Sequence, residues 1–425
     1  MKIAIVGAGS YVFGMGLLYD LIVEHRLPGM QLALMDLDGE MASLMAGVAG
    51  RMAADAGVAV ELEATTDRTA ALAGADYVTT SVAVQLRRRW EMDKAVMHRY
   101  GIREITSECG GVGGLSYALR SVALLLAIAR DMERLCPQAW LFNVTNPLPR
   151  VVTALTRHTR IRTAGFCSNA WGAYGGYGNV AALVGRDMRE IDVVSAGLNH
   201  FAWLLSARDR RTGEDLLPAV QAALEGGAWI GRPLTRGWWR RYGVLPLDGD
   251  SHTGEFFPFD PADGRELVAH HGNDEERTAR REALRAAAAG RQPWQPLLQG
   301  RAWERPADVI EALTSGRPRY LDMINVPNRG AIEGLPEEAI VQVPAWVEDG
   351  EIRPVGIGPL PPSIAELCTQ VSHVHDLVAE AAATGDRALV AEAVRADPAI
   401  SDKAAGLAAI EELIRVHGDL LTQFS

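Results

Sequence analysis

The sequence predicts an α/β protein with an N-terminal, doubly wound parallel sheet followed by a mixed, helix-rich α+β region. Two observations support this prediction. Short apolar runs alternate with helical patterns over the first 200 residues, as they do in βαβ units. From about residue 205 the alternation stops, and tryptophan, arginine and proline accumulate. We therefore expect two domains, at residues 1–200 and 201–425.

Five apolar runs are expected to form the parallel strands. In chain order they are KIAIVGAGS at 2–10, QLALMDLD at 31–38, ADYVTTSVAV at 75–84, AWLFNVTNP at 139–147 and IRTAGFC at 161–167. Helical patterns such as residues 115–135 separate them, which implies right-handed crossovers between parallel strands. Further helices are expected at 274–289 and within the alanine-rich stretch 377–420.

Composition favours an ordinary soluble protein that acts on small molecules. Of the 425 residues 48% are hydrophobic and 22% are charged, which allows large buried cores. The net charge of −11 argues against non-specific binding of nucleic acid. The apolar run 121–129 is too short to span a bilayer, so no membrane partner is expected. Four dispersed cysteines and the lack of a secretory signal pattern predict a cytoplasmic protein.

The first strand runs into the glycine turn GAGSYVFG, which indicates dinucleotide binding. Gly7 and Gly9, followed by Ser10, provide the tight turn and close backbone approach that a pyrophosphate requires. Position 12 is Val, so the third glycine of the Rossmann pattern is missing. Asp36 ends the second strand, where a carboxylate accepts from a ribose 2′-hydroxyl and repels a 2′-phosphate. The pattern predicts NAD rather than NADP; the alternative is a strand–helix turn without a phosphate.

Four more polar residues follow later strands, at the edge where an α/β sheet binds its ligands. Asn143 and Asn146 belong to NVTNP, Cys167 ends the fifth strand, and His200 follows the apolar run IDVVSAGL. A thiolate and an imidazole are ligands for first-row transition metals. Taken singly, Cys167 also fits a small buried thiol and His200 a core histidine. Their shared place at the sheet edge favours a joint role.

The order of motifs resembles glycoside hydrolase family 4, the NAD- and divalent-metal-dependent glycosidases. The motifs are the glycine turn, SECGGVGGLSYALRS at 107–121, NVTNP at 143–147, GFC at 165–167, GLNHF at 197–201 and GDSHTGEFFPF at 249–259. The resemblance runs from residue 1 to about 260 and, more loosely, to the C-terminus. It implies NAD and Mn²⁺, or another divalent cation, as cofactors. We also expect a homodimer or homotetramer.

The reaction implied by the resemblance is an exception to two-carboxylate glycoside hydrolysis. NAD⁺ takes a hydride from C3 of the sugar, and the ketone formed makes the C2 proton acidic. A base removes that proton while the metal holds the enediolate, and the glycosidic oxygen leaves from C1. Water then adds and the hydride returns. The expected activity is hydrolysis of an α-glycoside, with a neutral hexoside favoured and a uronide next.

Site residues are carried over from the family's motifs. Cys167 and His200 would bind the metal, and Asn146 would contact the sugar hydroxyls. Glu108 would orient a hydroxyl or relay a proton; the alternative is a charge that stabilises a helix start. Asn143 is assigned to the cofactor. The base that removes the C2 proton is expected to be Asp250, with Tyr242 and His252 as alternatives.

The residue after the metal cysteine departs from the family pattern. Members acting on neutral glycosides or glucuronides carry His there, and members acting on 6-phosphoglycosides carry Asn. This chain has Ser168 followed by Asn169, and both are expected to line the substrate pocket. A phosphosugar is therefore mildly disfavoured, and the sugar and its anomer stay open.

Two other classes of function remain open from the sequence. A stoichiometric 2-hydroxyacid dehydrogenase of the lactate/malate type would share the Rossmann start and the Asn-Pro after the fourth strand. It would also need an arginine for the substrate carboxylate, and it would release NADH. A non-catalytic NAD-binding sensor would keep only the cofactor site. Neither class accounts for Cys167 together with His200.

Overall fold

The computed structural model describes residues 1–425 except 11, 104–107, 168–175, 229–232, 260–272 and 299–303. Its N-terminal part is a parallel sheet with the strand order β3-β2-β1-β4-β5-β6, the order of doubly wound dinucleotide-binding folds. These strands are β1 (Lys2–Val6), β2 (Met30–Met35), β3 (Val60–Thr65), β4 (Tyr77–Thr80), β5 (Trp140–Asn143) and β6 (Arg162–Gly165). The predicted fold class is confirmed, and five of these strands match the five predicted runs.

Strand β3 is the one member of this parallel set that the sequence did not predict. Its segment VELEAT alternates apolar with charged residues, and none of its six residues is buried. It pairs only with β2, at the end of the strand order, so it needs no continuous apolar run.

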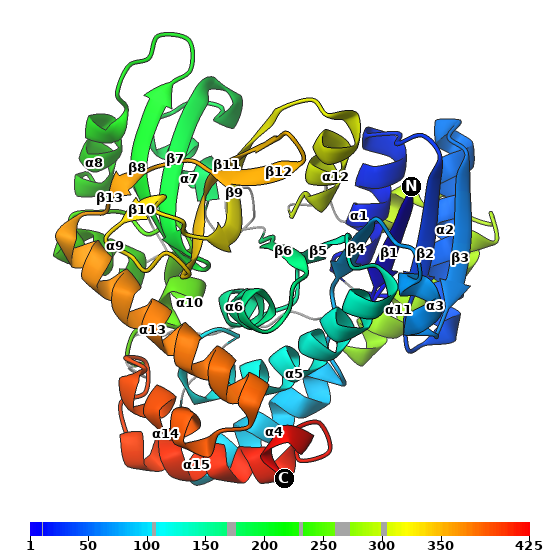
Figure 1. The fold of residues 1–425 in the computed structure, drawn as a ribbon. Helices are drawn as coiled ribbons and strands as arrows, with labels where there is room; N and C mark the ends of the chain where they lie inside the picture. The colour runs from blue at the N-terminus through cyan, green and yellow to red at the C-terminus, as the bar shows by residue number, and fades with distance from the viewer. Residues whose placement is uncertain (11, 104–107, 168–175, 229–232, 260–272, 299–303) are drawn as a thin grey trace.

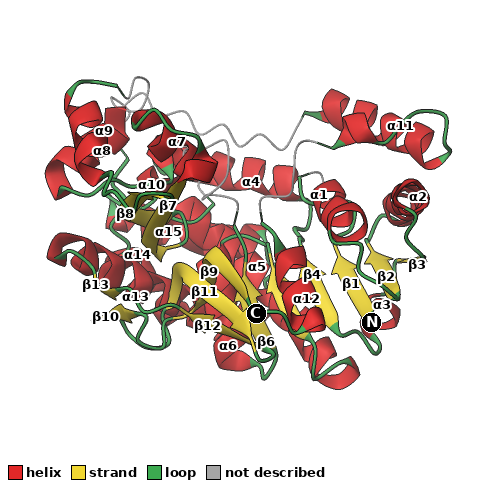
Figure 2. Cartoon of the chain, turned by 90° about the horizontal axis from the view of Figure 1, so that it is seen from above, coloured by secondary structure: helices red, strands yellow, loops and turns green. Residues whose placement is uncertain are grey.

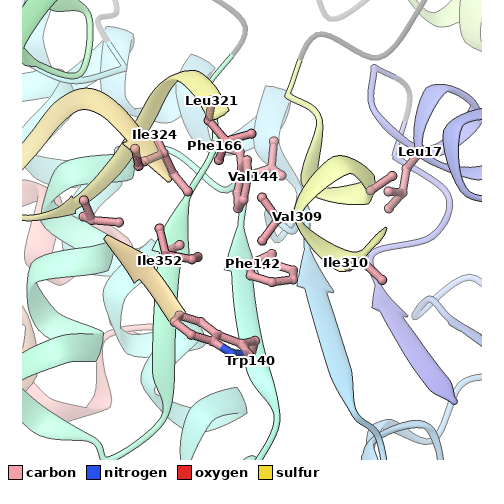
Figure 3. Close-up of a cluster of buried hydrophobic side chains, with 14 of the residues drawn as sticks. Leu17, Trp140, Phe142, Val144, Phe166, Val309, Ile310, Leu321, Ile324 and Ile352 are labelled. Atoms are coloured by element: carbon pink, nitrogen blue, oxygen red, sulfur yellow. The ribbon is translucent and has the colours of Figure 1, made fainter. Parts of the chain in front are cut away.

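Alternate residues of the parallel strands point to opposite faces of the sheet and enter two cores. Ile3, Ile5, Leu32 and Leu34 pack on one face, whereas Ala4 and Val6 pack on the other. The first core includes side chains from α1 (Gly14–Tyr19), α2 (Gly39–Ala56) and α12 (Pro306–Ser315). Figure 3 shows part of this core, with Phe142 of β5 lying beside Val309 of α12.

The second core is covered by helices from both ends of the chain (Figure 1). They include α3 (Arg68–Leu72), α4 (Leu86–Arg99), α5 (Gly111–Leu135), α6 (Leu148–His158), α13 (Pro362–Thr384), α14 (Arg387–Ala396) and α15 (Lys403–Val416). Helix α5 is long and apolar enough to cross a membrane, but 83% of its apolar window is buried inside the protein. That burial is consistent with the predicted core helix.

The sheet continues beyond β6 with antiparallel strands from residues 191–209 and 319–354. The order is β6-β9-β11-β7-β8, with β12 paired to β11, so that this sheet has 11 strands among the described residues. The added strands are β7 (Ile191–Leu198), β8 (Phe201–Asp209), β9 (Arg319–Pro327), β11 (Ile340–Glu348) and β12 (Glu351–Pro354). The expected domain boundary at residue 200 therefore falls in the turn between two paired strands, β7 and β8.

The remaining elements flank the two ends of this sheet. They are the pair β10 (Ile332–Glu333) and β13 (Gly358–Pro359), and the helices α7 (Gly176–Leu183), α8 (Leu217–Glu225), α9 (Pro233–Tyr242), α10 (Gly249–Gly254) and α11 (Asp274–Ala288). Figure 2 shows α8 and α9 at one end and α11 beside α2 at the other. The predicted helix at 274–289 matches α11, and the alanine-rich stretch 377–420 lies in α13, α14 and α15.

Candidate active site

The glycine turn after β1 brings together the residues predicted to bind a dinucleotide. Gly7 has a φ of +88°, and a Cβ atom there would lie 2.2 Å from the carbonyl oxygen of Ser81. The backbone N–H of Gly9 donates to the Asp36 carboxylate over 2.8 Å. A Cβ atom on Gly9 would lie 2.9 Å from that carboxylate. The turn therefore has no room for side chains at either glycine, as close approach to a pyrophosphate requires.

Gly14 has the packing role of the third glycine of the Rossmann pattern, which is missing at position 12. A Cβ atom at Gly14, the first residue of α1, would lie 2.5 Å from the carbonyl oxygen of Ala8. Gly14 thus permits close packing between the turn and the helix, and sequence reasoning missed it because the spacing differs from the usual pattern. Ser10 accepts a 2.9 Å hydrogen bond from the Ser81 hydroxyl, which ties this turn to the end of β4.

Two predicted substrate-site residues are in direct contact. The side-chain amide of Asn146 donates to Glu108 over 2.8 Å, although the residues are 38 positions apart. Asn146 follows β5, and Glu108 lies just before α5. An amide and a carboxylate held together at the carboxyl edge of the sheet can bind neighbouring hydroxyl groups of a sugar.

The side chain of Asn143, which was predicted to bind the cofactor, is hydrogen-bonded within the protein. Its side chain is completely buried; it accepts from the Thr80 hydroxyl over 3.0 Å and donates to the Thr145 carbonyl over 2.9 Å. Both polar atoms of the amide are therefore engaged within the protein. The geometry supports a scaffold role at the end of β5 and does not support contact between this side chain and a cofactor.

His200 stands in the two-residue turn between β7 and β8. Its φ of +61° lies in the left-handed region, and its side chain is buried. The preceding residue, Asn199, donates to Gln342 of β11 over 3.0 Å, and both of these amides are completely buried. The neighbouring strand thus holds the turn that carries the imidazole.

His200 meets two residues of the GDSHTGEFFPF motif. The ring centroids of His200 and His252 are 4.2 Å apart, and His252 Nδ1 lies 3.2 Å from Glu255 Oε1. One potential ligand atom from each of His200, His252 and Glu255 lies within 4.8 Å of the others. Two imidazoles and a carboxylate suit a divalent first-row cation such as Mn²⁺. The donor set therefore fits the metal that the sequence predicted, with two residues that the metal prediction did not include.

The two histidines have opposite pKa shifts. Burial, followed by the neighbouring His252, holds the pKa of His200 well below its usual range. Burial alone would lower the pKa of His252, but its hydrogen bond to Glu255 and the carboxylate charges of Glu255 and Glu108 raise it overall. At neutral pH the imidazole of His200 is therefore unprotonated, the form that binds a metal.

Cys167 lies directly after β6, half-buried, and packs against Leu148, Val152 and Ile340. Among the described residues, its sulfur is outside the group of three whose ligand atoms lie within 4.8 Å. Its role as a metal ligand therefore stays a prediction. Ser168 and Asn169, predicted to line the substrate pocket, fall outside the residues that the structure describes.

The carboxylate of Asp250 is engaged in holding the start of helix α9. It accepts hydrogen bonds from the backbone of Leu234 and Thr235 and from the Thr235 hydroxyl, over 3.2, 2.7 and 2.6 Å. A carboxylate in this position satisfies the N–H groups of the first helical turn and interacts favourably with the helix dipole. The structure therefore gives Asp250 a structural explanation and weakens its assignment as the base.

Tyr242, the second candidate for the base, belongs to an aromatic cluster. Its ring centroid lies 5.9 Å from that of Trp203 and 6.2 Å from that of Phe257. Phe257 in turn lies 5.7 Å from Phe201, the residue after His200. The cluster joins Tyr242 to β8, the strand that begins directly after His200, so Tyr242 stays a candidate.

Several known proteins are similar to this chain over most of its length. Family models described as family 4 glycosyl hydrolase match residues 2–179, and the C-terminal domain of that family matches residues 195–400. An α-glucosidase of Erwinia rhapontici is 29% identical, with 93% of each chain covered. A crystal structure of putative glucosidase lplD from Bacillus subtilis has a TM-score of 0.83 at 25% identity and covers 97% of this chain and 99% of its own.

A second solved structure has a similar fold. The crystal structure of a 6-phospho-α-glucosidase from gut microorganisms, in complex with NAD and Mn²⁺, has a TM-score of 0.81 at 21% identity. It covers 99% of this chain and 98% of its own. With both halves of the chain matched by models of one family, this protein belongs to family 4 of the glycosyl hydrolases.

Proposed function

We propose that this chain hydrolyses an α-glycoside with the help of NAD and a divalent metal ion, Mn²⁺ in the first instance. The observation that carries the proposal is that the dinucleotide turn after β1 and His200 after β7 belong to one sheet, and that His252 and Glu255 from α10 and its C-terminal end complete a His–His–Glu donor cluster. A lactate- or malate-type dehydrogenase needs no such cluster for hydride transfer, and a sensor needs no metal.

The chain's own residues bind the two cofactors. Gly7 and Gly9 form the tight turn that would approach the pyrophosphate, and Asp36, which accepts from the backbone N–H of Gly9, would accept from a ribose hydroxyl. His200 and His252 offer imidazole nitrogens for the metal, and Cys167 is proposed as a thiolate ligand. When bound, NAD and the metal supply a hydride acceptor and a Lewis acid.

Asn146 and Glu108 act on the sugar in this proposal. Their mutual hydrogen bond fixes both side chains, so that hydroxyls of the substrate meet an oriented amide and an oriented carboxylate. Glu108 can also accept or return a proton at a sugar hydroxyl. Tyr242 remains the candidate for the base at C2.

A neutral hexoside is the proposed substrate, with a uronide as the next choice. The α-glucosidase named among the relatives supports the first, at 29% identity over 93% of the chain. A cytoplasmic location and assembly as a homodimer or homotetramer are proposed with it.

A panel of nitrophenyl α-glycosides tests this proposal. The sugars should include glucose, galactose and their uronic acids, each assayed with NAD⁺, Mn²⁺ and a thiol reductant, and again with each cofactor left out. We expect cleavage of one sugar that requires both cofactors and causes no net accumulation of NADH. Oxidation of a 2-hydroxyacid with stoichiometric NADH would support the dehydrogenase instead, and NAD⁺ binding without any turnover would support the sensor.

A further inference from the structure

A continuous chain of contacts links the two histidines of the donor cluster through Glu255 and Cys109. His252 Nδ1 lies 3.2 Å from Glu255 Oε1, and the backbone N–H of Cys109 donates to Glu255 Oε2 over 2.5 Å. The chain ends where Cys109 Sγ lies 3.4 Å from His200 Nδ1. In both imidazoles, therefore, a protein group contacts Nδ1. A metal would then be bound through the other ring nitrogen, Nε2.

Tight packing fixes the backbone around Cys109. A Cβ atom on Gly110 would lie 1.8 Å from the carbonyl oxygen of Glu255, and a Cβ atom on Gly114 would lie 2.7 Å from the carbonyl carbon of Cys109. The Cys109 side chain is completely buried. The glycines of SECGGVGG thus let this segment press against the GDSHTGEFFPF motif, and the position of the thiol follows from the backbone.

If His200 binds a metal, the orientation of its ring depends on a hydrogen-bond acceptor for the nitrogen that does not bind the metal. A histidine that binds a metal through one nitrogen carries its proton on the other, and an acceptor for that N–H fixes both the tautomer and the ring orientation. A thiol sulfur is a weak acceptor, but here it is buried and held in place. Glu255 stands in the same relation to His252, as a carboxylate on Nδ1.

We propose that Cys109 is a positioning residue for His200: its sulfur accepts a hydrogen bond from Nδ1–H, which keeps the proton on Nδ1 and presents Nε2 to the divalent metal. This inference rests on the proposed function, because it takes His200 to be a metal ligand. Two adjacent residues of the SECGG motif would then have different roles: Glu108 contacts the substrate, and Cys109 orients a metal ligand.

The test measures binding of Mn²⁺ alone to the full chain and to the variants Cys109→Ala and Cys109→Ser. The matched control is Cys368→Ala, since Cys368 is an equally buried thiol that belongs to α13. NAD⁺ affinity, thermal stability and the absorption spectrum of the Co²⁺-loaded protein are recorded for each.

We expect Cys109→Ala to weaken Mn²⁺ binding about 10- to 100-fold while NAD⁺ affinity is unchanged. Cys109→Ser should recover part of the loss, since a hydroxyl also accepts a hydrogen bond, and should still alter the Co²⁺ spectrum. Cys368→Ala should lose stability and keep the Mn²⁺ affinity and Co²⁺ spectrum of the parent chain.

The inference is overturned if Cys109→Ala binds Mn²⁺ as the parent chain does. If that variant does not fold, a Cys109→Ser variant with the parent's affinity and Co²⁺ spectrum overturns it equally. A His200→Ala variant tests the metal site separately from the role of Cys109. If His200→Ala loses Mn²⁺ binding, the proposed metal site is supported independently of the result for Cys109. If His200→Ala binds Mn²⁺ with the affinity of the parent chain, the metal site itself is contradicted.

Discussion

The amide of Asn146 and the carboxylate of Glu108 form a 2.8 Å hydrogen bond across the carboxyl edge of the sheet. Because the two side chains hold each other, they should behave as one unit toward the substrate. Each of the variants Glu108→Gln and Asn146→Ala is expected to lower kcat/KM by about 10²-fold. The double variant should be little worse than either single one. Losses that multiply in the double variant would show that the residues act independently.

Asp250 is predicted to stabilise the protein without taking part in proton transfer. Asp250→Ala should lower the free energy of unfolding by about 1 kcal/mol, because the first turn of α9 loses its acceptor. Asp250→Asn keeps an acceptor oxygen but no base, so it should be nearly as stable as the parent and retain most of kcat. Urea unfolding and steady-state kinetics check both. A folded, stable Asp250→Asn variant without turnover would restore Asp250 as the base.

Cys167 is predicted to supply a thiolate to the metal. Cys167→Ser should keep the fold and NAD⁺ affinity, weaken Mn²⁺ binding and abolish turnover, because a neutral hydroxyl is a poor ligand. The sulfur-to-metal absorption band of the Co²⁺-loaded parent should disappear. Cys136→Ser is the control, since Cys136 is buried at the far end of α5. Near-native Mn²⁺ affinity and activity in Cys167→Ser would refute the ligand role.

The pKa of His252 gives a pH dependence with a definite sign. Its pKa in the folded protein is raised from the usual 6.5, so the protonated form is favoured by folding. The stability contributed by that charge is fully present below pH 6.5 and is lost as the pH rises through the raised pKa. In metal-free protein, the stability difference between the parent and His252→Asn should therefore be larger at about pH 6 than at about pH 8. Thermal unfolding in a chelator checks this, and a difference that is constant or grows with pH would contradict it.

The parallel sheet could be read from the sequence because its inner strands are apolar on both faces. Strand β3 could not, since its segment VELEAT is at the edge and alternates with charged residues. Strands β9 and β11 also join the same sheet, yet they come from residues after 318, and no local pattern says which edge a late strand will extend.

The sequence predicted the site residues that lie at the ends of strands. It did not predict the contacts that arise when distant segments pack together. The glycine turn, Asp36 and Asn146 follow strands, as the strand pattern implied, whereas Glu108, which lies before α5, was predicted from the resemblance to the family. The contacts of His200 with His252 and Cys109 join segments 52 and 91 positions away, and no spacing rule predicts them. Asp250 was chosen from the resemblance to the family, and no pattern in the sequence predicts its hydrogen bonds to the start of α9.

The central claim is that this chain cleaves its glycoside by transient oxidation of the sugar and not by direct displacement. The most direct measurement is the rate of aryl-glycoside cleavage, in the presence of NAD⁺ and Mn²⁺, for substrates carrying deuterium at C2 or at C3. We predict slower turnover with deuterium at each position and only a weak dependence on the leaving group. No isotope effect at either position, together with a steep dependence on the leaving group, would contradict the account.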